Sequence, residues 1–232
     1  MRRYRGGVLN GFVLAYLASA SAYLSTDGRF IVDTHTGKRV QLKCVNWYGA
    51  HQELYSVGGL ERQSIRNITM QIVRMKSNCV RLPLSIDLVY QNPPVLRSTI
   101  AAVDPAECPG LDNIRGMDLL DCVVYHLTDN GIMVILNNHA SRAAWVGANT
   151  MDKQGLWNMP GYPTQMWIDS LYNISARYRD NPLVVGVDIR NEIHDQACRA
   201  SASCGRMRPR KPCCAIPQRG IAGNCATDCG IP

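Results

Sequence analysis

The chain has 232 residues, ten cysteines and a formal charge of +7. With 46% hydrophobic and 19% charged residues, it can bury a sizeable core, which excludes a wholly disordered or fibrous protein. The length allows one large domain or two small ones. The cysteine count indicates an oxidising compartment, and the basic charge raises the question of a nucleic-acid partner.

Charge and cysteines are unevenly distributed and divide the chain into three segments. Residues 1–22 contain three arginines and no acid, and residues 197–232 carry a net charge of +5. The segment between them, residues 23–196, has a net charge of −1 and four of the ten cysteines. The basic charge therefore lies outside the central segment, and we expect no nucleic-acid partner.

Residues 1–22 have the pattern of a secretory signal peptide. The basic start MRRYR precedes a short apolar run, and the small residues ASASA follow it, with cleavage expected after Ala20 or Ala22. The apolar run is shorter than the roughly 18 residues that a membrane anchor needs. We therefore predict a secreted, extracellular protein that has no membrane attachment once the signal is cleaved.

The central segment begins with a predicted β-hairpin. Apolar and β-branched runs flank the turn Thr36–Lys38, and the second arm, residues 40–46, is the first long strand candidate.

After the hairpin, predicted strands and helices alternate. Further strands are expected at residues 79–84, where Pro83 ends the run, at 132–139 and at 183–192. Apolar residues at helical spacing predict helices over residues 61–77, 117–129 and 163–178, and Gly131 suits a helix cap. Residues 87–115 and 140–162 read as loops.

Each predicted strand becomes polar at its carboxyl end. The polar ends are Asn46, Arg81, Asn138–His139 and Asn191–Glu192. Continuous apolar strands joined by helices favour a parallel α/β sheet, in which functional sites form at the carboxyl ends. The turn NWYGAHQEL lacks the glycine pattern of a dinucleotide-binding open sheet, so a barrel is preferred.

Four motifs resemble the first four strands of the family 5 glycoside hydrolases, which are cellulase-type (β/α)8 barrels. The motifs are VNWYG, VRLPLS, VILNNHASRAAW and VVGVDIRNE. The resemblance covers roughly residues 24–195 and the first four of eight βα units, the N-terminal half of such a catalytic domain. A whole barrel takes about 250 residues. It implies an incomplete TIM barrel of four βα units, a β-linked polysaccharide or oligosaccharide substrate, and neither metal nor organic cofactor.

The resemblance also assigns roles to site residues. Glu192 matches the general acid/base, and Asn191 matches the residue that binds the sugar 2-hydroxyl. Arg81 matches an arginine that orders the catalytic carboxylates, and His139 matches a histidine that lines a sugar subsite. Trp47 and Trp145 are candidate platforms for the apolar face of a sugar.

The second carboxylate of a retaining mechanism is missing from this pattern. The two carboxyl groups must lie about 5–5.5 Å apart, whereas Asp188, four residues before Glu192 in one strand, would be roughly 13 Å away. Downstream acids are limited to Asp195 and Asp228, and Ile193 stands where the family usually has proline. We therefore expect a cellulase-like chain without activity of its own; the alternative is a non-catalytic secreted protein that binds glycan or another partner.

Residues 197–232 form a basic tail with six cysteines and no strand or helix pattern. Three interpretations remain: a disulfide-bonded appendage, a metal knot lacking the usual zinc spacing, or a disordered segment from a frameshift or intron read-through. In the body, Cys44 and Cys79 are expected to be packing thiols, and Cys108 and Cys122 to form a bridge. A half barrel would expose two sheet edges, so we expect instability, aggregation or dimerisation.

Overall fold

The computed structural model describes residues 24–145 and 154–193. Contacts divide the chain into Met1–His194 and Asp195–Pro232, and the second unit lies outside the described residues, as does the predicted signal peptide. The domain boundaries at residues 22 and 196 therefore stay predictions. Within the described ranges, no helix has the length and apolar character needed to cross a membrane.

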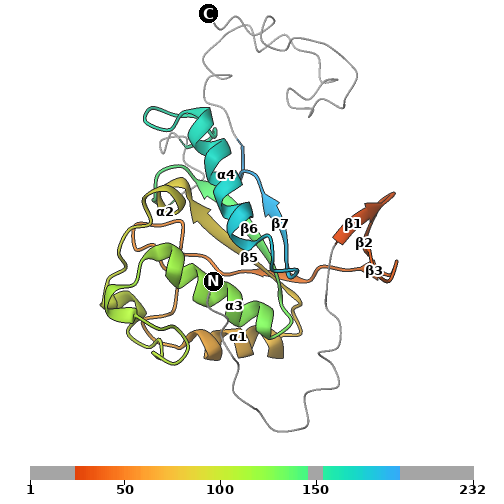
Figure 1. Cartoon of the computed structure of the whole chain (residues 1–232), viewed down its shortest axis with the longest axis horizontal. Helices are drawn as coiled ribbons and strands as arrows, with labels where there is room; N and C mark the ends of the chain where they lie inside the picture. Colours follow the sequence, from red (N-terminus) through yellow and green to blue (C-terminus); the bar gives the residue numbers. More distant parts are fainter. Residues whose placement is uncertain (1–23, 146–153, 194–232) are drawn as a thin grey trace, which may run out of the picture. The chain divides into compact units, whose positions relative to one another are not determined.

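Four parallel strands form the main sheet, in the order β4-β5-β6-β7. They are β4 (Cys44–Asn46), β5 (Cys79–Ser85), β6 (Met133–Ala140) and β7 (Val184–Asp188). The connections carry α1 (Ile65–Arg74), α3 (Gly116–Asp129) and α4 (Thr164–Tyr178), as Figure 1 shows. The predicted alternation of strand and helix, with a parallel α/β sheet, is confirmed.

The predicted long arm at residues 40–46 is wrong, because it divides between two sheets. An antiparallel sheet contains β1 (Leu24–Asp27), β2 (Phe30–Asp33) and β3 (Arg39–Val40), and the chain enters the parallel sheet only at β4. The division occurs where the side chain of Asn78 accepts from Lys43 N (2.7 Å) and donates to Gln41 O (2.9 Å). Asn78 thus takes up backbone groups that a continuous hairpin would pair.

Three further expectations needed correction. The strand predicted at residues 183–192 ends at Asp188, so Glu192 does not lie in one strand with Asp188. Pro83 does not end its strand, since β5 continues to Ser85. The Pro83 nitrogen lies on the β4 side of β5, as does the Arg81 carbonyl, which accepts from Trp47 N (3.0 Å). Because the β4–β5 pairing ends at Asn46 and Arg81, Pro83 removes no hydrogen bond from the sheet there. The loop predicted from residue 87 begins instead with the short helix α2 (Ile86–Gln91), whose N-terminus is capped by the Ser85 hydroxyl (3.2 Å to Leu88 N).

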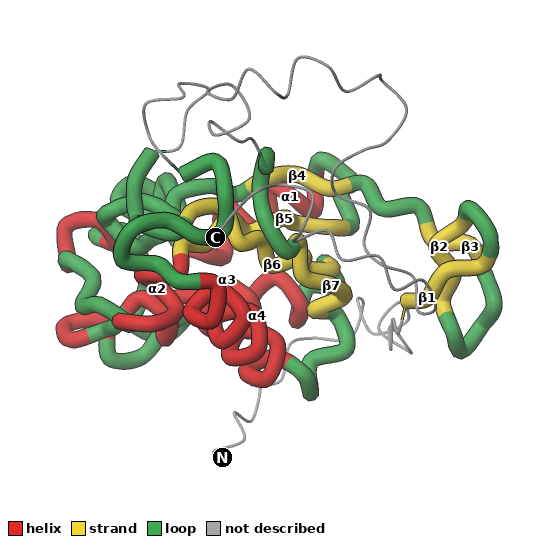
Figure 2. Tube along the Cα trace, turned by 90° about the horizontal axis from the view of Figure 1, so that it is seen from above, coloured by secondary structure: helices red, strands yellow, loops and turns green. Residues whose placement is uncertain are grey.

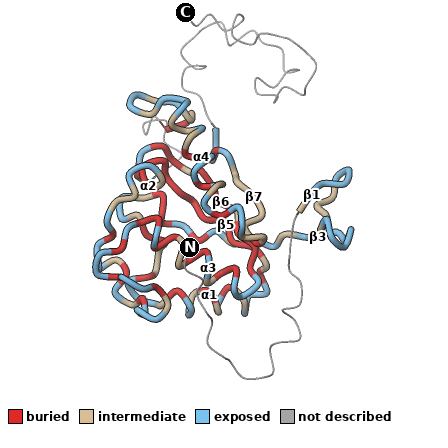
Figure 3. The backbone as a smooth tube through the Cα atoms, in the orientation of Figure 1, coloured by how far each residue is buried: buried red, intermediate tan, exposed pale blue. Residues whose placement is uncertain are grey.

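The core fills the space between the parallel sheet and its helices. Figure 2 shows α2, α3 and α4 together on one side of the sheet. Figure 3 shows that buried backbone follows β5, β6 and the facing sides of the helices. Fully buried members include Val80, Leu82, Val123, Leu127 and Val134. Most residues of β5 and β6 are buried, whereas Arg81, Ile135 and His139 are half-buried.

Two disulfides lie in this body. Cys44 and Cys79 stand directly opposite each other in the β4–β5 register, with Cα atoms 4.2 Å apart, and are bonded. The expectation of packing thiols is therefore wrong, because parallel pairing brings the two side chains together. The expected bridge from Cys108 to Cys122 is confirmed, and so is the cap at Gly131, which has a φ of +75°.

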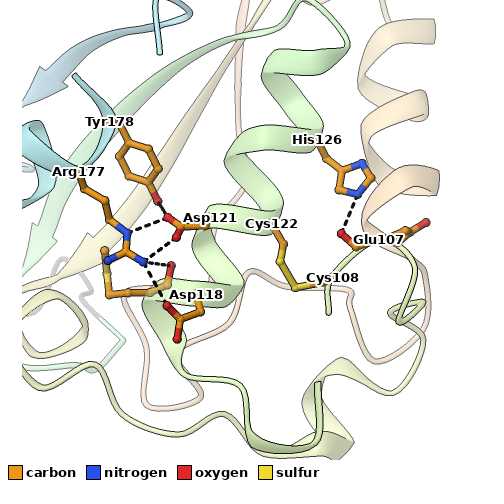
Figure 4. The surroundings of a disulfide bond; sticks show 9 residues. Glu107, Cys108, Asp118, Asp121, Cys122, His126, Arg177 and Tyr178 are labelled. Carbon is orange, nitrogen blue, oxygen red and sulfur yellow. Dashed lines mark hydrogen bonds and ion pairs between the residues drawn. A yellow bond between two sulfur atoms is a disulfide. The ribbon is translucent and has the colours of Figure 1, made fainter. Parts of the chain in front are cut away.

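An ion-pair cluster joins α3 to α4 beside the second disulfide (Figure 4). Arg177 donates to both carboxylate oxygens of Asp121 (2.8 and 2.6 Å) and to Asp118 (3.2 Å). The buried hydroxyl of Tyr178 also donates to Asp121 (2.7 Å). Burial, followed by the charge of Asp121, raises the pKa of Tyr178 well above its usual value. Asp121 thus accepts hydrogen bonds from two residues of α4.

We expect Asp121→Ala to lower the free energy of unfolding by about 2–3 kcal/mol, because the buried Tyr178 hydroxyl loses its acceptor. The matched control is Asp118→Ala, whose more exposed ion pair contributes less than about 1 kcal/mol. Pulse proteolysis in urea at low protein concentration measures both variants. Equal losses in the two variants would contradict this account.

The parallel sheet leaves β4 and β7 paired on one side only within the part of the chain that the structure describes. Exposed strand edges template pairing with another chain. Sedimentation velocity over a concentration series should therefore give an average mass that rises above the monomer. Ile189→Lys, beside the β7 edge and 50% exposed in the wild type, should reduce association by adding charge. A wild-type chain that stays monomeric and melts cooperatively would sink the prediction.

Candidate active site

Arg81, which lies within β5 and not at its carboxyl end, joins the carboxyl ends of β4 and β7. It lies opposite Asn46 in the β4–β5 register. Its Nε and Nη2 both donate to Asp188 Oδ2 of β7 (3.0 and 2.6 Å). Nη2 also donates to Asn191 Oδ1 (2.9 Å), and Nη1 lies 3.4 Å from Asn46 Oδ1. Of the predicted polar residues, Asn46, Arg81 and Asn191 are thus brought together by the guanidinium.

Asp188 is a member of this cluster that the sequence-based site prediction missed. Its Oδ2 accepts from Asn137 of β6 (2.9 Å) as well as from Arg81, and its side chain is 32% exposed. Asn137 and Asp188 are direct partners in the β6–β7 register. The available signal was an acid ending an otherwise apolar strand, VVGVD. Arg81 was expected to order catalytic carboxylates; the bonds above join it to the Asp188 carboxylate and to two asparagines.

Half-buried His139 lies beside a buried histidine, His51, which sequence reasoning did not select. Their ring centroids are 4.4 Å apart, and His51 is 3% exposed. Burial, with smaller contributions from the neighbouring cations, lowers the pKa of His139 to about 3. Burial is also the main cause that lowers the pKa of His51 to about 4. Both rings are therefore neutral at neutral pH.

The Asn191–Glu192 turn follows β7 in a strained conformation. Asn191 N donates to Asn138 O (2.9 Å), which holds the turn against the end of β6. Glu192 is exposed and has a φ of +38°, a left-handed conformation that costs a non-glycine residue roughly 1–2 kcal/mol. Such strain is concentrated at functional sites, and here it falls on the predicted acid/base.

Buried Arg190 connects this turn to the loop that follows β6. Its guanidinium donates to Asn138 Oδ1 (3.1 Å), to Ser141 Oγ (3.3 Å) and to the carbonyls of Gln154 (2.5 Å) and Leu156 (2.9 Å). One side chain thus binds the end of β6 and two backbone positions of the loop. The residue directly before Asn191 is therefore fixed on several sides.

The two predicted tryptophan platforms have different environments. Trp47 is 6% exposed, and its indole N–H donates to Gly58 O (2.9 Å), so it is a core residue in this structure and presents no open face to a sugar. Trp145 is 67% exposed. A further pair, Trp157 and Trp167, has ring centroids 5.5 Å apart, and Trp167 donates to Ile189 O (2.9 Å). Neither member of this pair was among the predicted site residues.

In chemical terms, the cluster offers hydrogen-bond donors and acceptors rather than metal ligands. Within residues 24–145 and 154–193, no three His, Cys, Asp or Glu side chains are grouped so that they could hold a metal ion. Amides, a guanidinium, neutral imidazoles and a carboxylate converge at the strand ends. Such groups suit a ligand rich in hydroxyls.

Among curated proteins, the chain is similar to a glycosyl hydrolase 5 family protein of Chamaecyparis obtusa, 34% identical over 193 residues. It is also 29% identical to an endoglucanase of Paenibacillus polymyxa and to the major extracellular endoglucanase of Xanthomonas campestris. These matches cover 78%, 83% and 77% of this chain but only 34%, 46% and 34% of the relatives. The chain therefore spans between a third and a half of their length.

Solved structures show the same partial coverage. The catalytic domain of the Xanthomonas campestris endoglucanase matches with a TM-score of 0.64 and 27% identity, over 75% of this chain and 46% of that domain. A Pyrococcus horikoshii endocellulase also matches at 0.64, with 19% identity, over 82% and 49% of the two chains; this likeness concerns the fold alone. The partial barrel is consistent with both.

The family model described as cellulase (glycosyl hydrolase family 5) matches residues 34–204. This match covers well over half of the chain and includes all four parallel strands and the polar cluster at their ends. The resemblance of the strand motifs is thereby confirmed, and the chain belongs to glycosyl hydrolase family 5.

Proposed function

We propose that this chain carries the acid/base side of a retaining β-glucan hydrolase, with Glu192 as the acid/base. The observation that carries the proposal is the turn after β7, where Glu192 takes a strained left-handed conformation beside the Arg81 cluster. Strain maintained by surrounding contacts positions a group for chemistry. Glu192 would protonate the glycosidic oxygen as the bond to the leaving sugar breaks.

The proposed substrate is a β-linked glucan. Relatives named endoglucanase support this class. In this assignment, Asn191 binds the hydroxyl beside the reacting carbon, and Arg81 holds its amide oxygen at 2.9 Å. His139 and exposed Trp145 contribute to sugar binding.

The nucleophile is the part that we propose this chain does not supply. Asp188 ends β7 four residues before Glu192, but its Oδ2 already accepts from Arg81 and Asn137. A carboxylate about 5–5.5 Å from Glu192 would be needed. Without it, the chain would bind glucan and hold the acid but would not complete a double displacement.

An external nucleophile tests both parts of this proposal. Azide can attack the anomeric carbon of an aryl β-cellobioside with a poor leaving group while Glu192 gives its proton to the departing phenol oxygen. We expect glycosyl azide formation with wild type and at least about 100-fold less with Glu192→Gln, the usual scale of general acid catalysis.

Two results would contradict the proposal. Equal azide-dependent rates in wild type and Glu192→Gln would remove Glu192 from its role. Hydrolysis of a soluble β-1,4-glucan by wild type without azide, lost in Glu192→Gln, would mean that the chain contains its own nucleophile.

Export is the other proposed property, supported by the signal-like residues 1–22 and by the extracellular relative. In a secreting host, the protein recovered from the medium should begin at Ser21 or Tyr23, as read by mass spectrometry of its N-terminal peptide. Leu14→Arg, which interrupts the apolar run, should reduce the exported amount. Protein retained in cells with Met1 intact would be evidence against export.

A further inference from the structure

We infer that Asn137 is a positioning residue that fixes His139 in the Nδ1-protonated tautomer, so that Nε2 offers a lone pair to a sugar hydroxyl. The inference rests on the proposed function only for the identity of that ligand. The tautomer itself follows from a chain of hydrogen bonds that begins at Arg81.

The first step concerns Asp188. Its Oδ2 accepts Nε–H and Nη2–H of Arg81 (3.0 and 2.6 Å). An oxygen that receives two donors from a guanidinium carries no proton, so it acts purely as an acceptor. The third neighbour of this oxygen, the amide of Asn137 at 2.9 Å, must therefore donate.

The second step carries this direction to the histidine. Because the Asn137 NH₂ group faces Asp188, its carbonyl oxygen faces the other way, 2.8 Å from His139 Nδ1. An amide oxygen has no proton to give, so Nδ1 must supply it. The reverse orientation of the amide would place its oxygen against Asp188 Oδ2 and lose a hydrogen bond to a charged group.

The third step concerns the other ring nitrogen. In a neutral imidazole, a proton on Nδ1 leaves Nε2 as an acceptor. Burial lowers the pKa of His139 to about 3, and the facing charged or titratable groups that act in the same direction are His51, Arg81 and Arg190. Protonation of Nε2 at neutral pH is therefore opposed, and its lone pair remains available for an O–H donor.

The unprotonated Nε2 of His139 can bind a group that donates a hydrogen bond, such as a hydroxyl, but not a group that only accepts one. A sugar hydroxyl can donate to Nε2, whereas a carbonyl, an ether oxygen or a carboxylate meets another lone pair there. His139 thereby discriminates in favour of an unsubstituted hydroxyl at this position of the sugar.

Nitrogen-15 NMR of histidine-labelled full-length chain, in solution or as a sediment, measures the tautomer without any glucan. The chain has five histidines, and His139→Gln identifies the signal. His126 is an internal reference, because its Nε2 lies 3.2 Å from the carbonyl of Glu107 and must donate there when neutral. We expect opposite tautomers, Nδ1–H for His139 and Nε2–H for His126. An Nε2–H signal from His139 would overturn the inference whether or not the protein binds glucan.

Two variants separate positioning from general stability. Asn137→Asp keeps an oxygen for His139 Nδ1–H but cannot donate to Asp188, whereas Asn137→Leu offers no acceptor. Asn137→Asp should keep Nδ1 protonated, and Asn137→Leu should show mixed tautomers. The same tautomer in both variants would contradict the role of Asn137.

Cellotetraose serves as the binding probe. By calorimetry, Asn137→Leu should bind it about three- to tenfold more weakly than wild type, the scale of one neutral hydrogen bond. Unchanged affinity would overturn the link from tautomer to ligand. A wild type that has the expected tautomer but does not bind cellotetraose would count against the proposed function instead, so the two failures are distinguishable.

Discussion

The contact between Arg81 and Asp188 is the interaction on which the candidate site depends. The bond crosses from β5 to β7 over the middle of β6, and one carboxylate oxygen accepts from both Arg81 and Asn137. With side chains 24% and 32% exposed, the pair is partly desolvated, and its charges are compensated by neighbouring amides. An isolated ion pair at this exposure would contribute little stability. The Arg81–Asp188 pair is important here because it determines the orientation of each neighbouring amide group.

Buried Arg190 restrains the backbone around the turn that carries Asn191 and Glu192. Arg190 binds the end of β6 and the loop after it, while the following residues make the turn at Asn191 and Glu192. Arg190 and the Asn191–Asn138 backbone bond restrain the two residues that precede Glu192, which has a left-handed conformation. The side chains before Glu192 thus supply the restraint, and Glu192 itself stays exposed.

Much of the architecture followed from local pattern. Continuous apolar runs identified β5, β6 and β7, and helical spacing identified α1, α3 and α4 within a few residues of their observed bounds. The errors occurred where a distant residue intervenes. The side chain of Asn78 divides the predicted strand at residues 40–46, the early end of β4 makes Pro83 harmless within β5, and packing buries Trp47 against Gly58.

Local periodicity and short motifs predicted the family, the order of the βα units and the polar residues Arg81, His139, Asn191 and Glu192. Which polar groups meet depends on how the strands and loops are assembled. The register places Asn137 opposite Asp188 and Cys44 opposite Cys79, and the loop after β4 places His51 against His139 of β6. A strand sequence gives its alternating faces but not its partner's alignment, so these pairings arise only when the strands are assembled.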